Sequence, residues 1–178
     1  MIPVVCPVPP WAQKLRGRER VRDLRRRAAR AVTRSAELLG RGDFVAEADP
    51  DGKPRPFQGM YWSRSHSRRW VAGVVAPHPV GIDVEGLREL GAGARALVGG
   101  GPDGLDRWVS LEAAVKCFGV GMPAARRIVI QDGAARLVGS SAGSARLWLE
   151  SAPSFRLGLA WVGARIPVRL SMHDAEAP

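Results

Sequence analysis

Two carboxylates set into an apolar run, Asp83 and Glu85, are the feature that most constrains the fold of this 178-residue chain. Side chains at positions i and i+2 of a β-strand leave by the same face, so these acids would point together while Ile82 and Val84 face the core. Gly81 would let the strand approach a neighbour or a ligand. Adjacent carboxylates repel unless a cation, a shared proton or a basic partner compensates them. Solvated acids at a strand end are the simpler alternative for the pair alone.

Length and composition favour one compact unit, because 178 residues of which 46% are hydrophobic can bury a real core. No stretch approaches the ~18–20 apolar residues of a membrane span, and the proline-rich start lacks the basic region of a signal peptide. Cys6 and Cys117 are too few for a disulfide framework and lack metal-site spacing. We therefore predict a cytoplasmic protein with no membrane partner.

The net charge of +10 favours an anionic partner, which could be nucleic acid, a phosphorylated small molecule or an acidic protein. Arginines surround a predicted helix over residues 16–40, which is also compatible with a plain solvated helix face. No zinc-finger, RRM or KH pattern accompanies it, so nucleic-acid binding is not favoured. Only three residues are lysines, which makes Lys14, Lys53 and Lys116 candidates for sites that need a compact ammonium group.

Periodicity and turn residues predict an α+β chain. Residues 41–61 are predicted to form a loop, and residues 86–106, with seven glycines, are predicted to form a mobile connector. The end of the chain is predicted to be a polar tail. A second helix is predicted over residues 105–118, where Glu112 and Lys116 share a face at i, i+4 spacing. Strands are predicted at residues 69–76, 80–85, 127–131, 145–150 and 155–162.

Four short motifs follow one another along the chain. They are Gly52-Lys53-Pro54, Ser65-His66-Ser67, Gly81-Ile82-Asp83-Val84-Glu85 and Trp108-x-x-x-Glu112-Ala113-x-x-Lys116. In this order and spacing they resemble the 4′-phosphopantetheinyl transferases of the larger, two-half, surfactin-synthetase-activating class, over roughly residues 14 to 163. That family moves phosphopantetheine from coenzyme A to a serine of an acyl or peptidyl carrier protein and releases adenosine 3′,5′-bisphosphate.

The resemblance implies a Mg²⁺ site and a set of catalytic residues. Mg²⁺ prefers oxygen ligands and neutralises charge on a pyrophosphate. By resemblance Asp83, Glu85 and Glu112 would supply its carboxylates. Lys116 would hold the pyrophosphate, and Glu112 would also act as general base toward the carrier serine.

The resemblance also implies residues that contact coenzyme A. Ser65 and His66 would contact coenzyme A, and His66, by a hydrogen bond to a phosphate, would count with Glu112 and Lys116 among the catalytic residues. Lys53 would contact the nucleotide or its 3′-phosphate. Lys14 and Arg25 would contact phosphates from the basic N-terminal segment. The remaining positive surface would suit an acidic carrier protein.

The fold implied by the family consists of two similar α/β halves related by a pseudo-twofold axis, residues 1–86 and 87–178. Asp83 and Glu85 would come from the first half and Glu112 and Lys116 from the second, with the site at their junction. Because one chain supplies both halves, we predict a monomer.

The chain departs from the family pattern at three places. Leu111 stands where the family's helix usually carries a lysine, so we expect Leu111→Lys to preserve or raise activity. The connector between the halves is short and rich in glycine, and the N-terminus is abbreviated. Two alternatives follow: a non-catalytic relative that binds coenzyme A or a carrier protein, and a basic nucleic-acid-binding protein.

Overall fold

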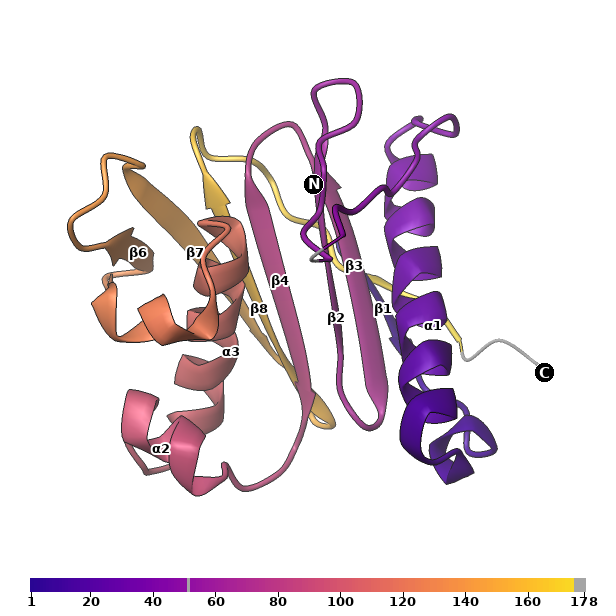
Figure 1. Cartoon of the computed structure of the whole chain (residues 1–178), viewed down its shortest axis with the longest axis horizontal. Helices are drawn as coiled ribbons and strands as arrows, with labels where there is room; N and C mark the ends of the chain where they lie inside the picture. Colours follow the sequence, from indigo (N-terminus) through magenta and orange to yellow (C-terminus); the bar gives the residue numbers. More distant parts are fainter. Residues whose placement is uncertain (51, 175–178) are drawn as a thin grey trace.

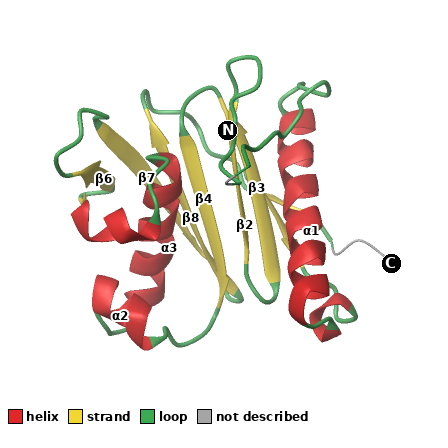
Figure 2. Cartoon of the chain, in the orientation of Figure 1, coloured by secondary structure: helices red, strands yellow, loops and turns green. Residues whose placement is uncertain are grey.

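The computed structural model describes residues 1–50 and 52–174 as helices packed on two β-sheets, which confirms the α+β class (Figure 2). The first sheet has the order β2-β3-β1-β9, made of β2 (Tyr61–His66), β3 (Trp70–Ala76), β1 (Val4–Pro7) and β9 (Ser171–Met172). The second has the order β4-β8-β7-β6-β5, made of β4 (Val80–Gly86), β8 (Phe155–Val162), β7 (Ser144–Ser151), β6 (Ala134–Leu137) and β5 (Ile128–Gln131). The helical elements are η1 (Ala12–Lys14), α1 (Gly17–Leu38), α2 (Ala92–Val98), α3 (Gly104–Cys117) and η2 (Met122–Arg127).

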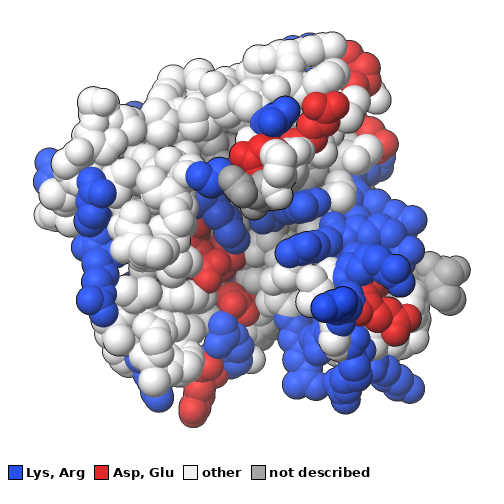
Figure 3. Space-filling model, in the orientation of Figure 1, with Lys and Arg blue, Asp and Glu red and all other residues white. Residues whose placement is uncertain are grey.

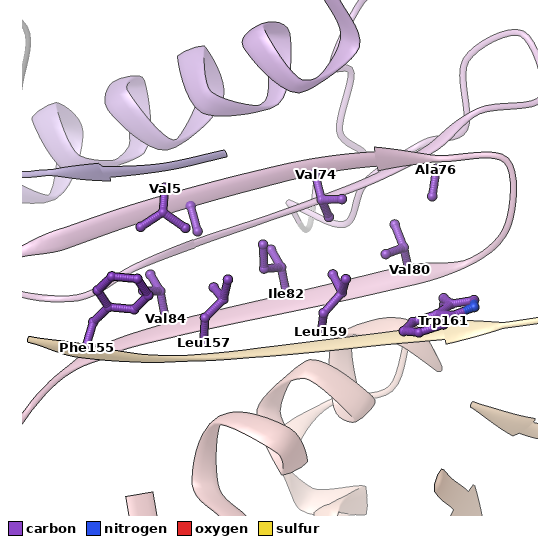
Figure 4. Packing of buried hydrophobic residues seen from close by; sticks show 11 residues of the cluster. Val5, Val74, Ala76, Val80, Ile82, Val84, Phe155, Leu157, Leu159 and Trp161 are labelled. Carbon is purple, nitrogen blue, oxygen red and sulfur yellow. The ribbon is translucent and has the colours of Figure 1, made fainter. Parts of the chain in front are cut away.

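The elements form four layers, with α1 outside the first sheet and α3 outside the second (Figure 1). The inner faces of the two sheets pack together as the main core, shown in Figure 4. Val74 of β3 belongs to this core together with Ile82 of β4 and Leu159 of β8, and all three side chains are fully buried. Burying each such side chain contributes about 1.5–3 kcal/mol to folding. The predicted inward direction of Ile82 and Val84 is thereby confirmed.

Glycines let both helices lie directly on their sheets. A Cβ atom at Gly81 would lie 2.0 Å from the carbonyl oxygen of Ala113 in α3, and one at Gly73 would lie 2.3 Å from the backbone nitrogen of Val32 in α1. Such distances leave no room for any side chain. Gly81 therefore serves the close approach of a neighbouring helix, which is one of the two roles predicted for it.

The two sheets contain the same strand–helix–hairpin unit. In the first, β1 is followed by α1 and the β2–β3 hairpin, and β1 pairs antiparallel with β3. In the second, β4 is followed by α3 and the β7–β8 hairpin, and β4 pairs antiparallel with β8. Strand β4, which we assigned from sequence to the first half, thus belongs to the second sheet by its hydrogen bonds. The turn before it, residues 77–79, leads the chain from one sheet to the other.

Several elements differ from the sequence-based expectation, among them β6, where no strand was predicted. The proline-rich start forms β1, and the segment that ends in Ser65 and His66 of the Ser-His-Ser motif forms β2. The supposed mobile connector contains α2, and the polar tail returns to the first sheet as β9, parallel to β1. Within the described residues, no helix has the length and apolar character needed to cross a membrane.

Candidate functional site

A cleft of about 990 Å³ opens between the two sheets, and nearly all the predicted site residues line it. Figure 3 shows acidic atoms in the hollow at the centre of the molecule and a large basic area over α1 beside it. The predicted residues that line the cleft are Arg25, Lys53, Ser65, His66, Asp83, Glu85, Glu112 and Lys116. They come from α1, the loop before β2, and the elements β2, β4 and α3, so the fold gathers segments that lie far apart in the sequence.

Asp83 lies at the bottom of the cleft and is the most enclosed of its acids, with 3% of its surface exposed. Its Oδ1 accepts hydrogen bonds from Ser65 Oγ at 2.7 Å and from Lys116 Nζ at 2.6 Å. Its Oδ2 is buried and has no hydrogen-bond partner among the described residues. A buried carboxylate oxygen without a donor is costly, so this atom is a candidate position for a cationic ligand or a proton.

Two buried serines hold β2 against β4 at the seam where the sheets meet. Ser63 Oγ accepts a hydrogen bond from the backbone N–H of Ile82 at 3.1 Å, and Ser65 Oγ accepts one from Val84 at 3.3 Å. These bonds satisfy N–H groups on the edge of β4 that no strand pairs with. The Ser65 hydroxyl, predicted to contact coenzyme A, is thus engaged inside the protein and fixes the position of Asp83.

Lys116 joins the helix to the strand. Besides its bond to Asp83, its Nζ donates to the carbonyl oxygen of Ile82 at 3.0 Å and lies 3.6 Å from Glu112 Oε2. Its side chain is 30% exposed, so the ammonium reaches the cleft while it neutralises a buried acid. The predicted pairing of Glu112 with Lys116 is present. Because Lys116 also contacts the buried Asp83, its ionic interactions matter more for stability than those of a pair on the protein surface.

Glu112 is held in an environment that disfavours its charge. Desolvation, and next to it the charge of the adjacent Asp83 carboxylate, raise the pKa of its carboxyl to about 7, against the opposing effect of Lys116. A carboxyl with a pKa near neutrality can exchange a proton at physiological pH, which is the property of a general acid or base. Perturbed acids of this kind concentrate at functional sites.

The third acid, Glu85, is paired with an arginine that we did not predict. Arg88 binds both its oxygens, with Nη2 at 2.7 Å from Oε1 and Nε at 3.1 Å from Oε2. The acids Glu85, Asp83 and Glu112 all raise the pKa of Arg88, the hydrogen-bonded Glu85 most of all. In this arrangement Lys116 and Arg88 supply positive charge to the three carboxylates from within the protein.

The residues present fit a divalent metal in their chemistry. No group of three His, Cys, Asp or Glu residues within ranges 1–50 and 52–174 is gathered closely enough to enclose an ion. Three carboxylates nevertheless line one cleft, Asp83 has an orphaned buried oxygen, and Glu112 has a raised pKa. A hard cation with oxygen ligands would relieve both conditions.

The opposite wall of the cleft is cationic. Lys53, Arg25 and Arg64 line it, and Arg64 also stacks over the ring of Trp62 at 5.5 Å. Arg64 was not predicted, although it stands between the serines of the β2 motif. Desolvation lowers the pKa of Arg64, and the like charge of Arg25 lowers it further. Two mutually repelling guanidinium groups in one cleft indicate a site for an anionic ligand.

His66 lies on the same wall. Desolvation lowers the pKa of its imidazole, and the positive charges of Lys116, Arg25 and Arg64 act in the same direction. The ring is therefore mainly neutral at pH 7, and an anion bound beside it would raise its pKa again.

Two sequence-based assignments do not fit the structure. Lys14, at the end of η1, is exposed and does not line the cleft. Leu111, the position of the family's lysine, is 4% exposed and belongs to the core between α3 and the second sheet. The premise that a lysine here would reach the phosphates is therefore wrong.

Replacing Leu111 by lysine should destabilise the fold instead of raising activity. An ammonium at this position would be desolvated among apolar side chains, with a cost of about 2–4 kcal/mol. Urea unfolding monitored by circular dichroism would show it, with Leu111→Met as a control that keeps most of the volume. A Leu111→Lys protein as stable as the wild type would contradict the burial of this position.

Comparison with protein-family models and with curated proteins finds no match to this chain.

Proposed function

We propose that this protein is a Mg²⁺-dependent 4′-phosphopantetheinyl transferase, which moves the phosphopantetheine arm of coenzyme A to a serine of an apo carrier protein. One observation carries the proposal. A single cleft places Lys53, Arg25 and His66 opposite Asp83, Glu85 and Glu112, with Lys116 among the acids. Apart from Arg25 of α1, these residues come from four separate motifs. A cationic wall facing an acidic one suits a polyphosphate bound together with a metal ion.

The reaction requires displacement at the pantetheine-side phosphorus of the pyrophosphate. The carrier serine oxygen forms the new P–O bond, the bond to the bridging oxygen breaks, and adenosine 3′,5′-bisphosphate leaves. Asp83, Glu85 and Glu112 would hold Mg²⁺, which supplies charge neutralisation at the phosphates when bound.

Each cleft residue has a task in this proposal. Glu112 accepts the serine proton as general base. Lys116 neutralises charge on the phosphate that leaves, and its bond to Asp83 fixes its position. His66, Lys53 and Arg25 bind the nucleotide phosphates.

Further parts of the proposal concern architecture and partners. The repeated strand–helix–hairpin unit supports two similar halves related by a pseudo-twofold axis, with the cleft at their junction. We propose a cytoplasmic monomer whose partner is an acidic acyl or peptidyl carrier protein. The basic area over α1 supports an acidic partner (Figure 3).

The test is the intact mass of an apo acyl or peptidyl carrier protein after incubation with this protein, coenzyme A and Mg²⁺. The proposal expects a gain of one phosphopantetheine arm that requires Mg²⁺. A folded protein that binds coenzyme A but modifies none of several carriers would support the second candidate, a non-catalytic binder. The occupation of the acids by Lys116 and Arg88 is the observation that favours this alternative.

A further inference from the structure

Arg88 is a cation of the acidic wall that belongs to none of the four motifs. Its guanidinium spans both oxygens of Glu85, and its Nη1 also donates to the carbonyl oxygen of Glu89 at 3.3 Å. A bidentate arrangement of this kind uses the in-plane lone pairs of the carboxylate. Those lone pairs are the ones that a divalent cation needs from Glu85.

The surroundings of Arg88 are strongly acidic. Asp83 and Glu112 act on it in addition to Glu85, so the guanidinium lies in the field of all three carboxylates. A divalent ion entering this cluster would meet both an occupied ligand and a repelling positive charge. The position of Arg88 therefore opposes the binding of a divalent cation by the three carboxylates.

The Arg88 side chain is also free to leave. It is 44% exposed, against 16% for Glu85, and it extends from the loop between β4 and α2. Exposed ion pairs are weak, so release of this arginine into solvent costs little. By contrast, Lys116 also bonds to the backbone of β4 and to the buried Asp83, which anchors it. Of the two internal cations, Arg88 is the exchangeable one.

From this geometry we infer that Arg88 is an internal competitor for the metal site, which holds Glu85 until a divalent cation displaces it. The inference rests on the proposed function for the identity of the site. In this arrangement Arg88 is a positioning residue that sets the metal concentration at which the site fills. It keeps the charge of Glu85 compensated whenever the metal is absent.

The test measures metal affinity directly and without turnover. Mn²⁺ is titrated into the protein without coenzyme A or carrier, the free ion is followed by electron paramagnetic resonance, and Mg²⁺ is then added as competitor. Arg88→Gln should lower the Kd for Mn²⁺ about fivefold, the scale expected for removal of one exposed ion pair. Arg95→Gln is the matched control, because Arg95 is an exposed arginine of nearby α2. It should change the Kd less than twofold.

A double-mutant cycle makes the inference specific to Glu85. In a Glu85→Gln background, Arg88→Gln should tighten Mn²⁺ binding clearly less than it does in the wild type, because the contested ligand is gone and only the repulsion by the guanidinium remains. Unchanged or weaker affinity in the single Arg88→Gln variant, or an effect of Arg95→Gln of equal size, would overturn the inference.

Failure of this inference and failure of the proposed function have different signatures. A wild-type protein that transfers the arm, while Arg88→Gln leaves the Kd unchanged, overturns the role of Arg88 alone. If Arg88→Gln lowers the Kd for Mn²⁺ fivefold but the wild-type protein modifies no carrier, the proposed transferase function is wrong, while the competition between Arg88 and the metal stands.

Discussion

Replacing Glu112 by glutamine is expected to lower the rate of arm transfer about 10³-fold while the fold is preserved. Glutamine keeps the volume of the side chain but cannot accept the serine proton and is a poorer metal ligand. General-base catalysis alone accounts for about 10²–10⁴-fold. Single-turnover mass spectrometry of the carrier protein would measure the loss, at saturating coenzyme A and carrier.

The same substitution should change how stability depends on pH. The folded protein raises the pKa of Glu112 from its ordinary 4.5 to about 7, so the folded state binds a proton more tightly than the unfolded state. The free energy of unfolding of the wild type, measured without metal, should therefore fall as pH rises from about 4.5 to about 7 and then level off. Glu112→Gln should lack this decline and should be the more stable protein at pH 8.

Glu37→Gln is the matched control, because Glu37 forms an exposed pair with Arg34 on α1, away from the cleft. Its transfer rate and its pH profile of stability should equal those of the wild type. Near-normal transfer by Glu112→Gln would remove Glu112 from both of its assigned roles. An unchanged pH profile would show that its environment is more hydrated than the structure indicates.

The sequence was most informative where chemistry and periodicity coincide. β4 was predictable because its apolar and acidic residues alternate, and α3 because its apolar residues recur at helical spacing. β2 was not predicted because two of its buried side chains are serines. These serines accept hydrogen bonds from β4, and such bonds leave no periodic hydrophobic pattern in the sequence. β9 left a trace that we did not use: Ile166, Val168 and Leu170 alternate just before it and pack on the main core.

The candidate site was predictable as a list of residues but not as a set of contacts. The motifs located Asp83, Glu112 and Lys116, yet the bond between Asp83 and Lys116 depends on how closely α3 lies on β4, a tertiary property. Arg88 belongs to no motif, and only the path of the loop brings it back to Glu85. The error at Leu111 was avoidable, since Leu111 lies in the apolar stripe of α3 with Val115, while Glu112 and Lys116 lie on another face.

Removal of the Lys116 ammonium tests the coupling between fold and site, and Lys116→Met is expected to lower both transfer and stability. The variant leaves Asp83, whose side chain is 4% exposed, with Ser65 as its only hydrogen-bond donor within residues 1–50 and 52–174. Breaking a buried ion pair from one side costs several kcal/mol, and since Lys116 is partly exposed we expect a loss of about 2–3 kcal/mol near pH 7. Transfer should fall at least 10²-fold, because charge on the phosphate that leaves is no longer neutralised.

A second substitution separates the two effects of Lys116. In Lys116→Met combined with Asp83→Asn, the buried charge is gone as well, so most of the lost stability should return while transfer stays absent. Lys14→Met serves as the control for loss of a lysine as such, because Lys14 is exposed and lies outside the cleft. Urea unfolding and carrier mass measured on all four proteins give the comparison. If Lys116→Met were as stable as the wild type, Asp83 would not depend on this ammonium, and if it transferred normally, Lys116 would have no part in the chemistry.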